Sequence, residues 1–296
     1  MGMQRIKQLA DKNGITSVLY NLPRLLKGYQ PIYLDYPVKA IPRYGYGRPV
    51  HPELAAILDE HRELYKRTLS EFLQFTGNLI EIPLSQPNTS KSPSWLNPWL
   101  SGLDAFALYG FIAAQDPSMY IEVGSGFSTK IVRKAISDHR LRTKIVSIDP
   151  HPRAEINIIC DQVIRQPLED CDLSILNELK SGDVFFLDSS HRSFMNSDVT
   201  VFFLEILPRL AKGVLVHIHD IHLPKDYMPE QSHWFYSEQY LLAASLLAGH
   251  SNFEVLLPNS YISKEHELSS VLDQFWSHPH MAEVPHGGCS FWIRTR

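Results

Sequence analysis

The rhythm of apolar and polar residues changes near residue 100. Before that point, the longest regular pattern runs from His51 to Phe75, where leucines and phenylalanines recur largely at helical spacings and predict one long helix. After it, short apolar runs alternate with longer amphipathic segments. Strands that alternate with helices are typical of a parallel sheet covered by helices on both faces.

The short apolar runs after residue 100 predict the strands of that sheet. The expected strands are residues 119–123, 144–148, 162–165, 184–187, 214–218, 253–257 and 290–294. The expected helices between or before them are residues 103–114, 129–138, 173–179, 199–210 and 238–248. We therefore expect an α/β domain of residues 101–296 with a Rossmann-like, mostly parallel sheet of seven strands.

The first hundred residues have a different character. Prolines punctuate an aromatic stretch before His51, and prolines at this density prevent long helices. The segment from Leu84 to Pro98 is rich in Ser, Pro and Asn, which predicts a loop that acts as a linker or a lid. Residues 1–100 are therefore predicted to form an irregular cover that contains the one long helix.

Charge and composition exclude several classes of protein. The net charge is −4 and the basic residues are scattered, so a nucleic-acid partner has little support. No apolar run is long enough to cross a bilayer, and the N-terminus lacks a signal-peptide core. Three cysteines without a CxxC pair fit a reducing compartment, so we expect a cytoplasmic protein without a membrane partner, with a homodimer left open.

A glycine turn follows the first predicted strand. Gly124 and Gly126 flank Ser125, and glycines let the backbone turn sharply and approach a ligand closely. Thr129 replaces the third glycine of the dinucleotide fingerprint, which counts against a nicotinamide cofactor. Asp149 ends the second strand 23 residues after Gly126, a spacing that suits hydrogen bonds to ribose hydroxyls. A tight turn and a turn-forming Asp would explain the same residues without a ligand.

Residues 121–126, followed by Asp149, resemble motif I and the ribose-binding acid of class I S-adenosyl-L-methionine (SAM)-dependent methyltransferases. Stretches at 147–153, 166–170, 186–191, 207–224 and 237–242 are similar to a bacterial branch related to sugar O-methyltransferases and cephalosporin-hydroxylase-like proteins. The resemblance covers about 95–292 and implies SAM as cofactor. The cofactor-binding residues to which it points are Glu122, Gly124, Ser125, Gly126, Ser128, Asp149, Gln166 and Glu169.

Histidines and carboxylates gather at two further strand ends. Asp188 follows one strand with His191 three residues on, and His219 and Asp220 follow the next strand. The carboxyl ends of parallel strands share one edge of a sheet, so these side chains are expected to lie together. Such a group suits a divalent metal or a general base oriented by a carboxylate. The catalytic candidates are His191, Asp188 and Asp220, although hydrogen-bonded core histidines would give the same pattern.

The resemblance also points to a metal at this cluster. Several related O-methyltransferases hold Mg²⁺ with acids at these two strand ends, where the ion lowers the pKa of the acceptor hydroxyl. Asp188 and Asp220 match two such ligands, whereas His219 stands where those relatives usually have an acid. Imidazole favours Zn or Fe over Mg. The candidate metal set is Asp188, His219 and Asp220, with Mg, Mn, Fe and Zn left open.

Large aromatic residues are the candidates for the substrate pocket, because such side chains suit small organic ligands. They are Tyr44, Trp95, Trp99, Tyr227 and Trp234. Packing of the N-terminal cover onto the sheet would explain them equally. The expected function is methyl transfer from SAM to a small molecule, at a hydroxyl of a sugar or natural product, with His191 or a metal removing the proton. Two alternatives stay open: a metal-dependent, oxygenase-like enzyme on the same fold and a non-catalytic SAM-binding protein.

Overall fold

The computed structural model describes the chain except for residues 1–21, 24–25, 27–34, 88, 153 and 250–251. Residues 1–40 and residues 41–296 form two compact units. Most of the predicted N-terminal cover before residue 35 therefore lies outside the described residues, and the boundary expected at residue 100 stays a prediction. In the part of the chain that the structure describes, no helix is both long enough and apolar enough to cross a bilayer.

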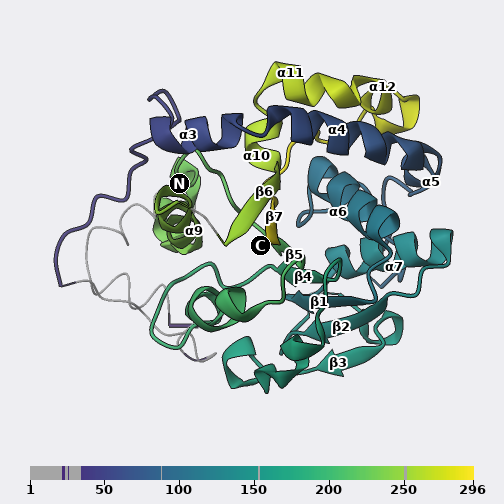
Figure 1. The fold of residues 1–296 in the computed structure, drawn as a ribbon, viewed down its shortest axis with the longest axis horizontal. Helices are drawn as coiled ribbons and strands as arrows, with labels where there is room; N and C mark the ends of the chain where they lie inside the picture. The colour runs from purple at the N-terminus through teal and green to yellow at the C-terminus, as the bar shows by residue number, and fades with distance from the viewer. Residues whose placement is uncertain (1–21, 24–25, 27–34, 88, 153, 250–251) are drawn as a thin grey trace. The chain divides into compact units, whose positions relative to one another are not determined.

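A seven-stranded sheet forms the centre of the larger unit (Figure 1). Its strands are β1 (Met119–Val123), β2 (Lys144–Ile148), β3 (Gln162–Ile164), β4 (Val184–Leu187), β5 (Leu215–Ile218), β6 (Phe253–Pro258) and β7 (Phe291–Thr295). Their order is β3-β2-β1-β4-β5-β7-β6, with β1 to β5 parallel and β7 antiparallel to both of its neighbours. The predicted Rossmann-like, mostly parallel sheet is confirmed.

The connecting helices follow from the order of the strands. Helix α7 (Phe127–His139) joins β1 to β2, so the chain there steps toward the β3 edge of the sheet. Helix α8 (Asp198–Val201) lies between β4 and β5, where the chain steps toward the β6 edge. Right-handed crossovers in opposite directions place these two helices on opposite faces. Helix α6 (Gly102–Gln115) precedes β1 and packs against α7, and α9 (Glu238–Leu247) follows β5.

Two predicted helices take tighter or wider turns than an α-helix. The segment expected to be helical at 199–210 is α8, followed by the π-helical turn η5 (Phe202–Ile206) and the 3₁₀ turn η6 (Leu207–Arg209). Pro208 has no N–H to continue the ladder, which ends the helix there. The segment expected at 173–179 is the 3₁₀ helix η4 (Leu173–Glu178). The remaining short elements are η2 (Asn157–Ile159), η3 (Leu168–Asp170), η7 (Pro229–Trp234), α10 (Asn259–Ile262), α11 (His266–Ser269), η8 (Ser270–Leu272), α12 (Asp273–Trp276) and η9 (Pro279–Met281).

The one long helix expected over 51–75 is wrong, because the chain breaks it. Helix α3 (Pro52–Asp59) ends before His61, whose φ of −114° and ψ of 19° are not helical, and α4 (Arg62–Phe72) starts anew. The 3₁₀ turn η1 (Leu73–Phe75) and α5 (Thr76–Ile80) follow. Because of the break, the apolar faces of α3 and α4 pack against different elements. Helix α3 packs against α9, whereas α4 packs against α6 and β6.

The central strands are buried on both faces, as apolar runs in parallel sheets usually are. All residues of β4 and β5 are buried, including His217 in the middle of β5. The His217 ring stacks on Phe186 with 3.9 Å between ring centroids, and its Nε2 lies 2.7 Å from Oγ of Ser290. His217 is therefore a packed residue of the core, and the polar side chains that remain available gather at the carboxyl ends of the strands.

Candidate active site

The turn after β1 is pressed against the end of β4. Gly124 has a φ of +79°, a region that L side chains rarely adopt, and a Cβ atom there would lie 2.0 Å from the main-chain oxygen of Asp188. The amide of Asp188 in turn donates to the carbonyl of Val123 at 2.9 Å. Glycine at position 124 is what lets the first turn and the Asp188 strand end share one site.

Glu122 supports this turn from beneath. Its side chain is fully buried and accepts hydrogen bonds from Tyr120 Oη at 2.9 Å, from Ser128 Oγ at 2.5 Å and from the Thr129 hydroxyl. Burial raises the pKa of Glu122 to about 7, against the lowering effect of these hydroxyl donors. The carboxyl group thus ties the start of α7 to β1, and it lines neither of the pockets beside the turn.

Asp149 fixes the loop after β2 to the glycine turn. One of its carboxylate oxygens accepts the amide of Ser125 at 2.8 Å, and the other accepts the amide of His151 at 2.7 Å. Each carboxylate oxygen keeps a further lone pair, and the side chain is only partly buried. The residue is therefore held in one orientation with acceptor capacity left for ligand hydroxyls.

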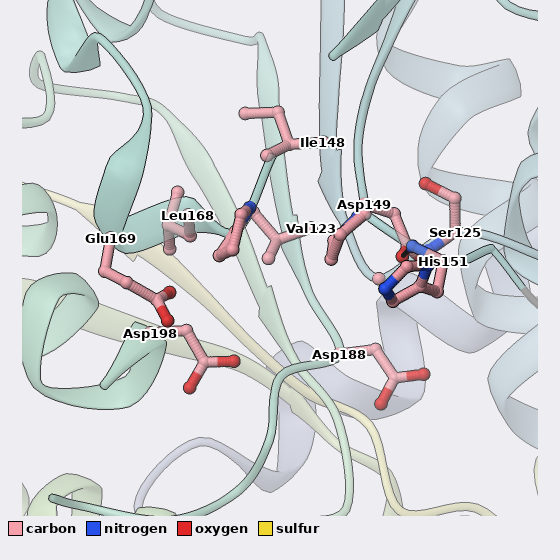
Figure 2. Close-up of a pocket in the computed structure, with 12 residues that line it drawn as sticks. Val123, Ser125, Ile148, Asp149, His151, Leu168, Glu169, Asp188 and Asp198 are labelled. Carbon is pink, nitrogen blue, oxygen red and sulfur yellow. Dashed lines mark hydrogen bonds between the residues drawn. The ribbon is translucent and has the colours of Figure 1, made fainter. Parts of the chain in front are cut away.

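These groups line a pocket of about 310 Å³ (Figure 2). Figure 2 shows the carboxylates of Glu169 and Asp198 on one side of it and those of Asp149 and Asp188 on the other. Apolar contacts come from lining residues such as Val123, Ile148 and Leu168. A pocket with an apolar wall and several acids suits an aromatic base, ribose hydroxyls and a positively charged group.

The other predicted cofactor residues divide between this pocket and its neighbour. Gly126 and Ser128 line a second, smaller pocket that continues from Gly124 to His219. Glu169 lines the first pocket, whereas Gln166 is exposed and lines neither. The structure thus brings most of the predicted set to one side of the sheet edge and leaves Gln166 outside it.

His191 stands between three carboxylates. Its Nε2 lies 3.3 Å from Oδ1 of Asp188 and 3.4 Å from Oδ2 of Asp220, and its Nδ1 lies 2.8 Å from Oε2 of Glu238. The ring is almost fully buried, and Glu238 at the start of α9 is completely buried. The three residues predicted to be catalytic are brought together, with Glu238 as a fourth member.

The surroundings of His191 favour a charged ring. Burial alone would lower the pKa of His191, but the carboxylates of Asp188 and Glu238 raise it well above its usual value. Since both ring nitrogens face carboxylate oxygens, both have reason to carry a proton. Burial also raises the pKa of Glu238, against the lowering effect of His191. The His191 ring, held by Glu238, therefore places a positive charge next to Asp188 and Asp220.

His219 faces a different group of donors. Its Nε2 lies 3.7 Å from Sγ of Cys289, which lies just before β7 and donates to Oδ1 of Asp220 at 3.3 Å. Sγ of Cys289 also lies 3.6 Å from Oδ2 of Asp104, a fully buried residue of α6. Burial raises the pKa of the Cys289 thiol well above its usual value, and the carboxylates of Asp104 and Asp220 add to the effect.

Of the predicted metal set Asp188, His219 and Asp220, only His219 belongs to the group of potential ligands that lie close together in the structure. Among the described residues, the donor atoms that lie within 4.8 Å of one another are those of Asp104, His219 and Cys289. Between Asp188 and Asp220, the Nε2 atom of His191 occupies the position from which a cation would bridge the two carboxylates. A Mg²⁺ ion that bridges Asp188 and Asp220 does not fit this arrangement of side chains.

The aromatic residues predicted for the substrate pocket divide into two groups. Trp95 and Trp99 line a third pocket of about 570 Å³, together with His219, Asp220 and Cys289. Trp99 is 49% exposed, whereas Trp95 is buried and donates from Nε1 to the carbonyl of Leu79 at 3.2 Å. This pocket meets the second pocket at Trp99 and His219.

The other three aromatic residues line none of these three pockets. Tyr227 is buried, and its hydroxyl accepts the amide of Gln239 at 3.1 Å. Tyr44 packs on His51 with 4.7 Å between ring centroids, and Trp234 packs on Tyr236 with 5.2 Å. The packing explanation of these residues has the support of their contacts.

Sequence reasoning missed Glu238, Asp104 and Cys289. A signal existed for Asp104, since it is the one charged residue of the apolar helix α6. Glu238 lies 47 residues from His191 and Cys289 lies 70 residues from His219, so neither pairing leaves a mark in local spacing. An odd cysteine in an otherwise unremarkable segment gives no indication of its neighbours.

Residues 121–221 match the family model described as a methyltransferase domain. No curated protein matches the chain. Among solved structures, the SAH-bound methyltransferase PaMTH1 of Podospora anserina is similar at 16% identity and a TM-score of 0.40, over 86% of this chain and 100% of that one. The O-methyltransferase of Bacillus cereus in complex with SAH is similar at 14% identity and a TM-score of 0.38, over 77% and 90% of the two chains.

The matched residues run from within β1 to just beyond β5. The glycine turn, Asp149, Asp188 and Asp220 follow strands of this region. The order of the strands agrees with the fold expected for that domain, and the cofactor expected from the sequence is SAM. Residues 121–221 are therefore similar to a methyltransferase domain.

Proposed function

We propose that the protein transfers the methyl group of SAM to a hydroxyl of a small, ring-shaped acceptor such as a sugar or a natural product. The observation that carries the proposal is the Asp188–His191–Asp220 cluster, which shares its sheet edge with the glycine turn. Asp188 lines both pockets beside Gly124, and Asp220 lines the pocket beyond. Acidic groups thus follow the path from the cofactor side to the acceptor side.

The cofactor residues have distinct roles in this proposal. Asp149 would accept the ribose hydroxyls of the cofactor, and the turn from Gly124 to Gly126 would hold its methionine part. SAM supplies a methyl group on a positively charged sulfur. The carboxylate of Asp188, beside Gly124, stabilises that positive charge. Glu122 keeps the turn in place from below.

Asp220, rather than His191, receives the proton of the acceptor hydroxyl in this proposal. Both nitrogens of His191 already face carboxylates, so the ring has no free lone pair to offer. The hydroxyl loses its proton to Asp220 as the oxygen attacks the methyl carbon in line with the departing sulfur, which leaves as a neutral thioether. His191, held by Glu238, fixes Asp220 and offsets negative charge on the oxygen.

The pocket beside Asp220 supports an acceptor of this kind. Trp95 and Trp99 give it aromatic surface, and Asn97 and Ser101 give it polar groups. Its volume of about 570 Å³ is that of a typical small-molecule site. Aromatic surface with polar groups around it suits the face of a ring and the hydroxyls at its edge.

The test is methyl transfer from labelled SAM to a panel of sugar and phenolic hydroxyl compounds. Asp220→Asn is expected to lose about 100-fold or more in turnover, because a general base contributes about that much, while its affinity for SAH stays unchanged. Asp273→Asn, at an exposed position of α12, is the matched control and is expected to keep full turnover. An Asp220→Asn protein with the turnover of the wild type would contradict the proposal.

A further inference from the structure

Three potential metal ligands from distant parts of the chain meet at the third pocket. Asp104 comes from the first turn of α6, His219 from the end of β5, and Cys289 from the segment that leads into β7. Sγ of Cys289 lies 3.6 Å from Oδ2 of Asp104 and 3.7 Å from Nε2 of His219. One donor atom of each residue lies within 4.8 Å of the other two.

These separations are close to the edges of a tetrahedral zinc site. With Zn–S of about 2.3 Å and Zn–N or Zn–O of about 2.0 Å, a tetrahedral angle puts sulfur about 3.5 Å from each of the other ligands. The two observed separations exceed that value by only a small margin. One thiolate, one imidazole and one carboxylate are donors that Zn²⁺ accepts together, whereas Mg²⁺ prefers oxygen ligands alone.

Hydrogen-bond donors from several residues hold the carboxylate of Asp104 in place and ionised. Oδ1 accepts Nδ2 of Asn259 at 2.8 Å and the amide of Ser290 at 2.8 Å, and Oδ2 accepts the hydroxyl of Ser101 at 2.5 Å. The amide of Cys289 adds a bond of 2.9 Å to Oδ2. Such outer contacts fix a ligand in place and hold it ionised.

His219 and the pocket supply two further observations. The ring of His219 is almost fully buried, its Nε2 lies 3.7 Å from the sulfur of Cys289, and its Nδ1 has no hydrogen-bond partner among the described residues. His219 and Cys289 both line the third pocket, through which an ion could enter.

We propose that Asp104, His219 and Cys289 form a site for a zinc-like divalent cation, with the fourth position open to the pocket. The Oδ1 atom of Asp220, 3.3 Å from the sulfur, lies beside that position. Binding of the cation stands apart from methyl transfer. Only the use of the open position, for an oxygen of the acceptor, rests on the proposed function.

The experiment is titration of the purified full-length protein with Zn²⁺, and with Co²⁺ as a spectroscopic probe. We expect one equivalent of Zn²⁺ to bind, and bound Co²⁺ to show thiolate-to-cobalt absorption with the visible bands of a tetrahedral ion. Cys289→Ser should lose the thiolate absorption and weaken Zn²⁺ binding by about 100-fold or more. Cys160→Ser, at a cysteine in another part of the fold, is the control and should behave as the wild type.

A second measurement does not depend on how the Cys289→Ser protein folds. In a protein with Cys160 and Cys171 both replaced by Ser, Cys289 is the one remaining thiol. Zn²⁺ should slow its alkylation, and His219→Asn should abolish that protection. Stoichiometric binding that needs neither Cys289 nor His219, or no binding at all, would overturn the proposal. Affinity for SAH, measured on the same samples, separates this outcome from failure of the cofactor site.

Discussion

The two parts of the site at the sheet edge are built in different ways. The cofactor side is the part around the glycine turn and Asp149, and the acceptor side is the part around His191 and His219. On the cofactor side, the partners are near in sequence: Glu122 bonds to Ser128 six residues on, and Asp149 bonds to Ser125 over 24 residues. On the acceptor side, Cys289 reaches His219 over 70 residues and Asp104 over 185 residues. The first side forms within one strand–helix–strand unit, and the second requires most of the fold to be in place.

The largest expected effect falls at the junction of the two sides. Gly124→Ala places a Cβ atom 2.0 Å from the carbonyl oxygen of Asp188 at a φ of +79°, so the turn and the strand end must separate. We expect a loss of about 3 kcal/mol or more in the free energy of unfolding, together with loss of SAH binding. Urea denaturation and calorimetry measure the two effects.

Gly77→Ala is the matched control for this substitution. Gly77 lies in α5, and no heavy atom lies within 4 Å of its added Cβ. Alanine favours a helix over glycine by about 0.5–1 kcal/mol, so this variant should be equal to the wild type or slightly more stable. A Gly124→Ala protein that matched it would show that the two sides are not coupled through residue 124.

The next effect tests the acceptor side alone. Glu238→Gln leaves the buried His191 with one anionic partner fewer and places an amide against a neighbouring donor. We expect a loss of about 3 kcal/mol in the free energy of unfolding, while SAH binding stays within a few-fold of the wild type. Glu205→Gln, at an exposed position, should leave both quantities unchanged. Equal stability of the two variants would sink the assignment of His191 as a buried cation.

The pH dependence of stability tests whether His191 is positively charged in the folded protein. The pKa of His191 is raised on folding, so its contribution is fully present at acidic pH and is lost as pH rises through the raised value. Glu238→Gln removes one cause of the raised pKa and should move that loss to lower pH. Unfolding curves from mildly acidic to alkaline pH compare the two proteins.

A further effect on stability, of similar size, tests the support of the cofactor side. Folding raises the pKa of Glu122 from 4.5 to about 7, so its protonated form is favoured in the folded protein. Stability should therefore fall as pH rises between these two values, by about 3 kcal/mol at 1.36 kcal/mol per pKa unit. Glu122→Gln should flatten this part of the profile, and an unchanged profile would contradict the raised pKa.

The smallest expected effect concerns ligand binding. Asp149→Asn places an amide against one of the two backbone N–H groups that the carboxylate accepts, from Ser125 and His151. Affinity for SAH should fall by about 10- to 100-fold, since hydrogen bonds to charged groups contribute about 1.5–3 kcal/mol. Asp170→Asn, exposed in a neighbouring turn, is the control. Equal affinities would remove Asp149 from the ribose contact.

The sequence predicts one of these two sides far better than the other. The glycine turn and Asp149 lie next to strands whose apolar runs mark their ends, so both could be placed from local pattern. The partners of His191 and His219 depend on how α9, α6 and β7 dock against the sheet, which periodicity does not encode. The break at His61 was not predicted for the same reason, because it depends on the different packing partners of α3 and α4.

The direction of β7 determines which loop reaches the third pocket. Because β7 runs opposite to β5, its beginning, rather than its end, lies at the edge where the parallel strands end. The short segment from Gly287 to Ser290 therefore reaches the acceptor side without passing through the cofactor side. Substitutions in this one segment can reshape the third pocket while the glycine turn and Asp149 keep their contacts.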